Sequence, residues 1–192
     1  PRFEDVVEIG LAARAAGFDA LWFADHFEMG HGTAEDPFRG MWECWTLMAA
    51  VAARVPDLQI GSLVACTGYR NPGVIAKMTE MIDEISGGRF ILGLGAGWHR
   101  PEYDHFGFPF DHRVSRFEDA ISIIHPLLRE GKADYQGEFF QANAALNIPR
   151  GPRAHGAPIM VGSNGPRMLN LVARYADAWN TAWHSDTAKA KT

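Results

Sequence analysis

Residues 90–98 read FILGLGAGW, an apolar run that turns into alternating glycines. The start is typical of a buried parallel strand, because both faces of such a strand are covered and its side chains are apolar throughout. Gly93, Gly95 and Gly97 lack a β-carbon, so another group can approach the backbone closely where the strand ends. Helical patterns precede and follow this stretch. In α/β proteins, ligands commonly bind at such a carboxyl end of a strand.

The composition is that of an ordinary globular protein. Of the 192 residues, 47% are hydrophobic and 21% charged, enough for one domain with a real core. The formal net charge is −5 without a basic block, so no nucleic-acid partner is expected. No apolar run approaches the ~18 residues that span a bilayer, so no membrane partner is expected. Cys44 and Cys66 have no metal-like spacing, so we predict reduced thiols, no metal site and a cytoplasmic location.

Helices and strands alternate along the chain. Apolar residues at three- and four-residue spacing, or a proline start, predict helices over 3–16, 42–54, about 73–85, 112–129 and from 166. Compact apolar runs predict strands over 18–24, 58–65, 90–94, 158–162 and 177–183. Between them we expect loops over 28–40 and 98–110, a hairpin at 135–140 within an irregular insertion over 133–156, and a further helix beginning near 184.

Strict alternation with right-handed crossovers gives a parallel sheet. Two closures fit, an open doubly wound sheet and a (β/α)8 TIM barrel. The first unit carries no dinucleotide-binding fingerprint, and the glycines of residues 93–97 do not match G-x-G-x-x-G and lie on the third predicted strand. We therefore favour a single α/β TIM-barrel domain over 1–192, incomplete because it holds about five of eight strands. The chain begins with Pro1 rather than methionine, and we expect it to start inside a longer protein.

Several short strings form a specific combination: WFADHF at 22–27, TGYRNP at 67–72, SGGR at 86–89, LGLGAGW at 92–98 and GSNG at 162–165. Together they resemble the bacterial luciferase-like flavin and deazaflavin oxidoreductases over essentially the whole chain. The pattern is more similar to members that use the deazaflavin coenzyme F-420 than to the luciferases. Some flavin mononucleotide (FMN) enzymes share the same strings, so FMN is the alternative cofactor.

The resemblance implies a barrel whose coenzyme lies across the carboxyl ends of the strands. The family's barrel has eight strands, and this chain is expected to lack the first and the last two. An incomplete barrel exposes two sheet edges, which can pair with another chain. Closure is therefore expected from further sequence or from a partner, and the family commonly forms homodimers.

The resemblance also assigns site residues. Asp25 and His26 are implied as the catalytic pair, with His26 exchanging a proton while Asp25 orients the imidazole or binds the edge of the coenzyme ring. A non-prolyl cis peptide bond is implied within residues 63–67, behind that ring. The implied cofactor-binding residues are Leu63, Val64, Cys66, Thr67, Gly95, Ala96, Gly97, Trp98, Gly162, Ser163 and Asn164.

Structural interpretations stand beside these roles. His26 could cap a loop or pack on Trp22, and Asp25 could cap a helix or form an ion pair. Residues 95–98 could be a tight turn with a packing tryptophan. Residues 162–164 could simply precede a capped helix, or their free N–H groups could bind an anion with help from Arg167.

Four other polar residues are weighed more lightly. His99 and Glu102 are further candidates for polar contacts in the site. Arg70 and Lys77 are expected to be structural or surface charges.

Three functions fit the sequence. The first is hydride transfer between F-420 and a small organic substrate. The second is an FMN-dependent monooxygenase that activates oxygen. The third is a non-catalytic barrel fragment that binds a ligand or a subunit.

Overall fold

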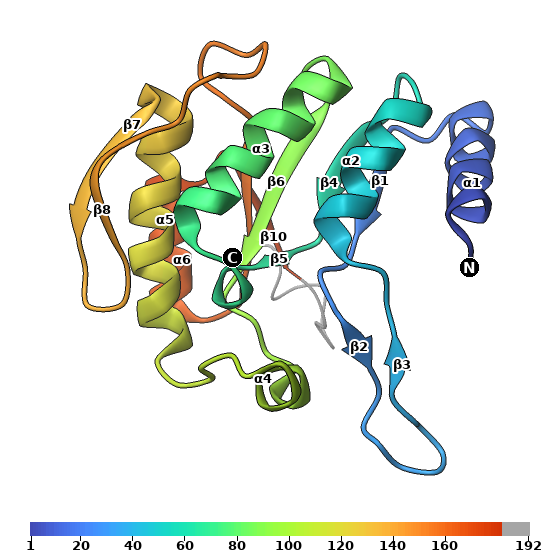
Figure 1. The fold of residues 1–192 in the computed structure, drawn as a ribbon, viewed down its shortest axis with the longest axis horizontal. Helices are drawn as coiled ribbons and strands as arrows, with labels where there is room; N and C mark the ends of the chain where they lie inside the picture. Colours follow the sequence, from blue (N-terminus) through green and yellow to red (C-terminus); the bar gives the residue numbers. More distant parts are fainter. Residues whose placement is uncertain (182–192) are drawn as a thin grey trace.

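A parallel sheet forms the centre of the molecule. The structure is a computed structural model that describes residues 1–181 (Figure 1). Five strands pair in parallel in the order of the chain: β1 (Ala20–Phe23), β4 (Gln59–Ser62), β6 (Phe90–Gly95), β9 (Ile159–Gly162) and β10 (Ala178–Asn180). A short strand, β5 (Ala65–Cys66), continues alongside β6. A doubly wound sheet reverses its strand order at a switch point. The unbroken order is therefore that of a barrel wall, as predicted.

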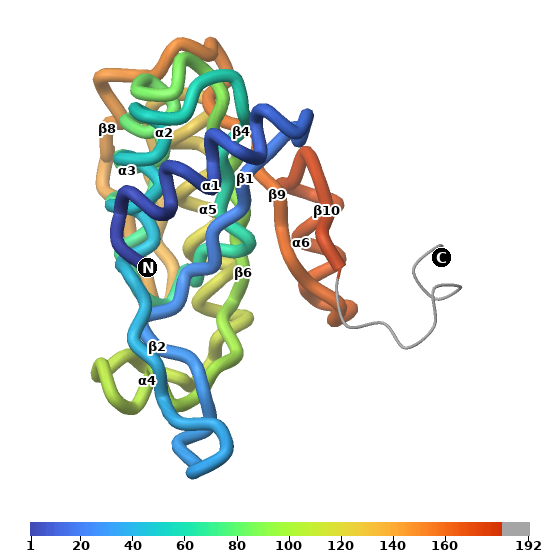
Figure 2. The backbone as a smooth tube through the Cα atoms, turned by 90° about the vertical axis from the view of Figure 1, so that its right-hand side faces the viewer, coloured from blue at the N-terminus to red at the C-terminus, as the bar shows by residue number. Residues whose placement is uncertain are grey.

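The long helices follow the same order. Each packs on the next one along the chain: α1 (Phe3–Ala15), α2 (Cys44–Arg54), α3 (Pro72–Ser86), α5 (Arg113–Glu130) and α6 (Pro166–Tyr175). In Figure 1, α2, α3 and α5 lie in front of the strands. In the view turned by 90°, β9, β10 and α6 curve away from the plane of β1, β4 and β6 (Figure 2). A ring of helices around a curving sheet is the arrangement of a (β/α)8 barrel, present here in part.

The alternation of side chains along β6 separates the core from the barrel interior. Phe90, Leu92 and Leu94 are fully buried and belong to the main hydrophobic cluster. Gly93 and Gly95 lie on the opposite face, because successive residues of a strand point to opposite sides. On that opposite face Trp22 covers its β4 partner Gly61, where a β-carbon would overlap the indole ring. Trp22 is nevertheless 40% exposed, so this interior face is only partly covered by the described residues.

The helix boundaries follow local capping rules. Asn71 accepts a hydrogen bond from the Gly73 N–H (2.9 Å), Pro72 begins α3, and Gly87 ends it at φ +65°. Glu43 caps α2 by accepting the N–H groups of Trp45 and Thr46. These predicted helices are confirmed to within a few residues.

Three predicted segments differ from the structure. Residues 98–110 are not all loop, because Arg100–Phe106 form helix α4, which is too short to show helical periodicity. Within 28–40, β2 (Glu28–Met29) and β3 (Arg39–Gly40) pair as an antiparallel ribbon. The hairpin is longer than residues 135–140, with strands β7 (Lys132–Gln136) and β8 (Gln141–Leu146).

The last two predicted elements lie partly or wholly beyond residue 181, the last residue that the structure describes. The final strand is described as Ala178–Asn180. Residues 182–183 and the helix expected from 184 lie outside the described residues. Within residues 1–181 there is no helix with the length and apolar character to cross a membrane.

The irregular segment after β8 is fastened to α3 by a buried ion pair. Asp83 is fully buried, and Arg153 donates to it through Nε (3.0 Å) and Nη2. Arg153 also donates to the Phe90 carbonyl, so one guanidinium joins the segment, α3 and the start of β6.

Arg153→Ala is expected to lower the free energy of unfolding by about 3–5 kcal/mol, because it leaves a buried carboxylate without its cation. Urea unfolding measures this loss. The control is Arg100→Ala, whose ion pair with Asp104 is exposed on both sides and should contribute about 0–1 kcal/mol. Similar losses in the two variants would contradict a special role for the Arg153 pair.

Candidate active site

Asp25 lies just beyond β1 and is committed to partners inside the protein. Its carboxylate accepts two hydrogen bonds from Arg70 (2.7 and 3.0 Å) and one from the Cys66 N–H (3.0 Å). Burial raises the pKa of the Asp25 carboxyl, and the Arg70 guanidinium opposes that rise. Asp25 is hydrogen-bonded to Arg70 and Cys66, and the imidazole of His26 is oriented by another group.

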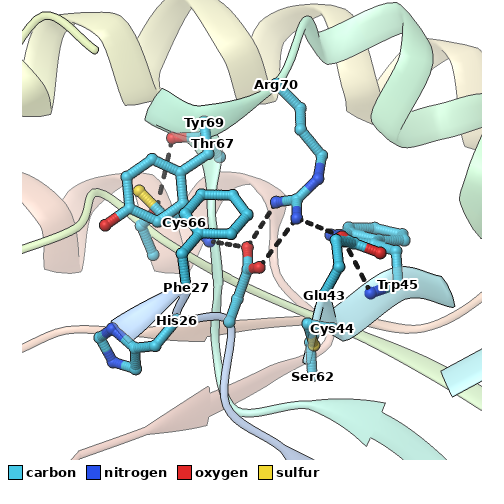
Figure 3. A network of polar contacts seen from close by, with 12 residues as sticks. His26, Phe27, Glu43, Cys44, Trp45, Ser62, Cys66, Thr67, Tyr69 and Arg70 are labelled. Carbon is cyan, nitrogen blue, oxygen red and sulfur yellow. Dashed lines mark hydrogen bonds and ion pairs between the residues drawn. The ribbon is translucent and has the colours of Figure 1, made fainter. Parts of the chain in front are cut away.

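Arg70 has the structural role expected for it. Beyond Asp25, it donates to Glu43 (2.5 Å), the cap of α2. Its guanidinium lies over the rings of Phe27 and Trp45, 5.7 Å from each centroid. Figure 3 shows Arg70 extending toward Cys66 and Glu43, with the His26 ring turned away from it. The ion pair thus joins the ends of three elements at one rim of the sheet.

His26 is held by Glu102 of α4. The His26 Nδ1 lies 2.7 Å from the Glu102 carboxylate, which is fully buried. The same carboxylate accepts the Tyr69 hydroxyl (2.9 Å) and the N–H groups of Phe27 (2.5 Å) and Glu28 (3.2 Å). Burial pushes the pKa of Glu102 upward, but the hydrogen bonds from His26 and the two amides outweigh it and lower the pKa.

The ring of His26 lies beside Trp98. The two ring centroids are 5.8 Å apart and nearly perpendicular, and Trp98 is 60% exposed. Because Nδ1 is bound to Glu102, the Nε2 atom of His26 is the nitrogen that can serve a ligand. The ring of His26 thus packs on Trp98, while its Nε2 atom stays available to a ligand.

Val64 packs against the ends of two strands, β6 and β9. The Leu63–Val64 peptide bond is cis, as the resemblance implied. A β-carbon on Gly95 would lie 2.6 Å from Val64 Cγ2, and one on Gly162 would lie 3.0 Å from Cγ1. The glycines thus admit Val64 against the ends of β6 and β9, which is the close approach that the alternating glycines indicated.

The side chains of Cys66 and Thr67 are engaged within the protein. Cys66 Sγ lies 3.0 Å from the Tyr103 hydroxyl, and Thr67 donates to the Gly95 carbonyl at 3.3 Å. Burial raises the pKa of the Cys66 thiol to about 11. The Tyr103 hydroxyl also reaches the Ala96 carbonyl (3.1 Å), so it closes the turn around Gly97.

Residues 162–164 lie at the same rim, beside β10. The Ser163 N–H donates to the Asn180 carbonyl (3.0 Å), and the Trp179 indole donates to the Ser163 carbonyl (2.8 Å). Asn164 and Thr181 are joined through their side chains. Arg167 donates to Glu118 (2.5 Å) and Ser115 (3.0 Å) of α5, so its charge is already compensated there.

The rim contains polar residues that the sequence did not single out. Glu43, Tyr69 and Tyr103 complete its hydrogen-bond network. Their bonds to Arg70, Glu102 and Cys66 join residues 27 to 37 positions apart in the chain, so no local sequence pattern predicts them. Glu102, which the sequence analysis weighed only lightly, binds His26, Tyr69 and two backbone amides. Among the described residues, no group of histidine, cysteine, aspartate and glutamate side chains could hold a metal ion.

The chain forms part of a (β/α)8 barrel, and its polar site lies at the carboxyl ends of the strands. This combination is typical of barrel enzymes. The family model for luciferase-like monooxygenases matches residues 1–192. The chain belongs to this family, whose members are oxidoreductases that use flavin or F420 cofactors.

Relatives in the family differ in chemistry. The chain is 35% identical over 182 residues to the pyrimidine monooxygenase RutA of Rhizobium rhizogenes, covering 92% of this chain and 49% of RutA. It is 31% identical over 166 residues to 5,10-methylenetetrahydromethanopterin reductase of Archaeoglobus fulgidus, covering 86% of this chain and 45% of the reductase. The chain thus spans about half the length of these curated relatives.

Solved structures show the same fold. An F420-dependent secondary alcohol dehydrogenase in complex with an F420-acetone adduct superposes with a TM-score of 0.80 at 22% identity, covering 94% of this chain and 54% of that one. The oxygenating constituent of 3,6-diketocamphane monooxygenase from Pseudomonas putida, in complex with FMN, gives 0.73 at 17% identity, covering 92% and 51%. At these identities the likeness concerns the fold alone.

Gly97→Ala is expected to destabilise the protein more than Gly107→Ala. Both glycines have positive φ (+79° and +76°), so both variants incur the same backbone cost of about 1 kcal/mol. A β-carbon at 97 would also overlap the Tyr103 hydroxyl and lie 2.6 Å from Cys66 Sγ, whereas one at 107 meets nothing. Thermal unfolding of the two variants isolates this clash, and equal melting temperatures would refute it.

The lowered pKa of Glu102 predicts an acid-dependent loss of stability. The folded protein keeps this carboxyl ionised at lower pH than the unfolded chain does, so its contribution is full above the ordinary value of 4.5 and is lost as pH falls below it. Glu102→Gln removes the titration while keeping the shape. The difference in unfolding free energy between wild type and this variant should shrink from about pH 7 to pH 3; a constant difference would contradict the assignment.

Proposed function

We propose that the protein transfers a hydride between the deazaflavin coenzyme F-420 and a small organic substrate. The observation that carries this proposal is His26, held by buried Glu102 at the strand ends and packed against an exposed tryptophan. The 31% identical relative named as a reductase supports hydride transfer, and the use of F420 by members of the family supports the choice of coenzyme.

The residues at the rim fit a flat ring system. Val64 against Gly95 and Gly162 provides an apolar floor without side-chain bulk on either glycine. Residues 96–98 follow the end of β6, and residues 163–164 follow the end of β9, so both segments begin next to that floor. We therefore expect these groups, with Leu63, Cys66 and Thr67 behind them, to hold the coenzyme, which when bound supplies the carbon that exchanges hydride.

The residues of the chain would then carry out the proton transfer that accompanies hydride transfer. In alcohol oxidation, Nε2 of His26 would take the hydroxyl proton, and the bound coenzyme would supply the acceptor for the hydride from the carbinol carbon. Glu102 accepts the Nδ1–H and stabilises the imidazolium that forms. Asp25 acts one step away, because it fixes the Cys66 backbone and hence the segment carrying Val64.

An FMN-dependent monooxygenase is the second candidate, favoured by the likeness to a pyrimidine monooxygenase. Titrating the purified protein with F-420 and with FMN separates the two. Deazaflavins react poorly with oxygen, so oxygen consumption with FMN would favour the monooxygenase. Binding of neither coenzyme to a folded sample would favour a non-catalytic barrel fragment.

The partners and location are proposed on similar grounds. We propose that the outer edges of β1 and β10 are covered by further strands or by a second copy in a homodimer, because an uncovered edge invites pairing. The free, buried thiols of Cys44 and Cys66 agree with a reducing compartment, and we propose the cytoplasm.

His26→Ala is expected to lower kcat by about 100-fold or more, the usual contribution of a positioned acid or base. The dissociation constant for F-420 should stay nearly unchanged. Stopped-flow reduction and a fluorescence titration measure the two quantities. The control is His155→Ala, in the irregular segment before β9, which should leave both quantities unchanged. Unimpaired turnover in His26→Ala would remove the proton-transfer role.

A further inference from the structure

His99 is a buried imidazole with an unused nitrogen next to the site. It follows Trp98 and precedes α4, and it is only 3% exposed. Its Nε2 atom is buried and has no hydrogen-bond partner among the described residues. Buried polar atoms are nearly always paired, so an unpaired one calls for a group that completes it.

Two further histidines contact His99. The centroid of its ring lies 6.0 Å from that of His26 and 6.3 Å from that of His31, and both pairs meet edge-on. His26 and His31 each have Nδ1 2.7 Å from a carboxylate, Glu102 and Asp36 respectively. In both rings the carboxylate engages Nδ1, which leaves Nε2 as the nitrogen that can serve a ligand. The cluster therefore brings three imidazole rings together, two of which, His26 and His99, also contact Trp98.

The charges nearby argue against a strongly anionic ligand. Arg70 is paired with Asp25 and Glu43, and Arg39 is paired with Asp36. Arg100 is paired with Asp104. With these guanidiniums engaged, the cluster offers groups that donate to a carbonyl or accept from a hydroxyl, which imidazole does in its two protonation states.

We propose that His99 is a substrate-binding residue. Its Nε2 accepts a hydrogen bond from a second hydroxyl of the substrate, or donates one to a second carbonyl. His26 serves the oxygen on the reacting carbon, and His99 serves the oxygen on its neighbour, as in a 1,2-diol or an α-hydroxyketone. This inference rests on the proposed function, because it takes His26 as the group at the reacting oxygen.

The first test observes the nitrogen itself. In protein labelled with ¹⁵N-histidine, the Nε2 resonance of His99 should report an unbonded nitrogen in the free protein. Adding acetoin should shift it, whereas 2-butanone, which lacks the second oxygen, should not. The proposal is overturned if Nε2 is already hydrogen-bonded in the free protein, or if acetoin leaves its resonance in place. This test needs no bound coenzyme.

The second test separates binding from stability. His99→Phe should raise KM for 2,3-butanediol about tenfold, the effect of one lost hydrogen bond, with kcat and all constants for 2-butanol nearly unchanged. His99→Gln, which keeps a donor and an acceptor, should restore part of the loss. The melting temperature of His99→Phe should not fall, because Nε2 of His99 has no hydrogen bond among the described residues that the substitution could remove.

The outcomes are distinguishable from a failure of the proposed function. Equal losses for both alcohols, or a large fall in melting temperature, would make His99 a structural residue and overturn the inference. A wild-type protein that binds F-420 but oxidises neither alcohol, while His99 still responds to acetoin, would instead count against the proposed reaction.

Discussion

A single buried carboxylate organises the rim of the sheet. Asp25 follows β1, receives the backbone N–H of Cys66 from β5, and binds Arg70, which in turn binds the cap of α2. Removing one partner of a buried ion pair leaves a charge that water cannot reach, so such a pair enforces its geometry strongly. The position of the β5 segment, and with it Val64, is therefore fixed by the Asp25 ion pair as well as by the burial of Ala65 and the pairing with β6. This is why an aspartate beside a candidate catalytic histidine is here a positioning group.

A second carboxylate does the same for the loops above the rim. Glu102 gathers His26, Tyr69 and two backbone amides, and thereby fixes α4 against the segment that leads into β2. At the other end of the strands, Arg89 and Arg153 bind backbone carbonyls and Asp83. At the carboxyl ends of the strands, carboxylates accept hydrogen bonds from side chains and backbone amides. At the amino ends, arginines donate hydrogen bonds to backbone carbonyls. In barrels the carboxyl end carries function and the opposite end carries stability, and this division is visible in the two sets of contacts.

Sequence periodicity predicted the repeating units well and their long-range contacts poorly. Strands such as 90–94 are predictable because burial on both faces requires an apolar run. Gly95 and Gly97 indicated a close approach to the backbone, and the structure shows that Val64 and Tyr103 make it. Helix α4 was missed because seven residues hold too few turns for a periodic signal. The partner of Asp25 is 45 residues away, and that of His26 is 76 residues away. No local pattern encodes such pairs, since they exist only after the strands have aligned.

The distribution of the site over the sheet bears on what closes the barrel. The hydrogen-bonded groups of the rim come from the segments that follow β1 and β4 and from α4. The carboxylates of Asp25 and Glu102 have their hydrogen-bond partners within the described residues, so the described chain itself fixes these two groups. Trp22 at one edge and Trp179 at the other are 40% and 42% exposed, and large exposed aromatic side chains commonly mark surfaces that another segment covers. We expect the covering segments to act mainly by excluding water and bounding the substrate, because interactions among charged groups strengthen when water leaves. On this view selectivity depends on the closing segments, while the orientation of the His26 ring is fixed by Glu102.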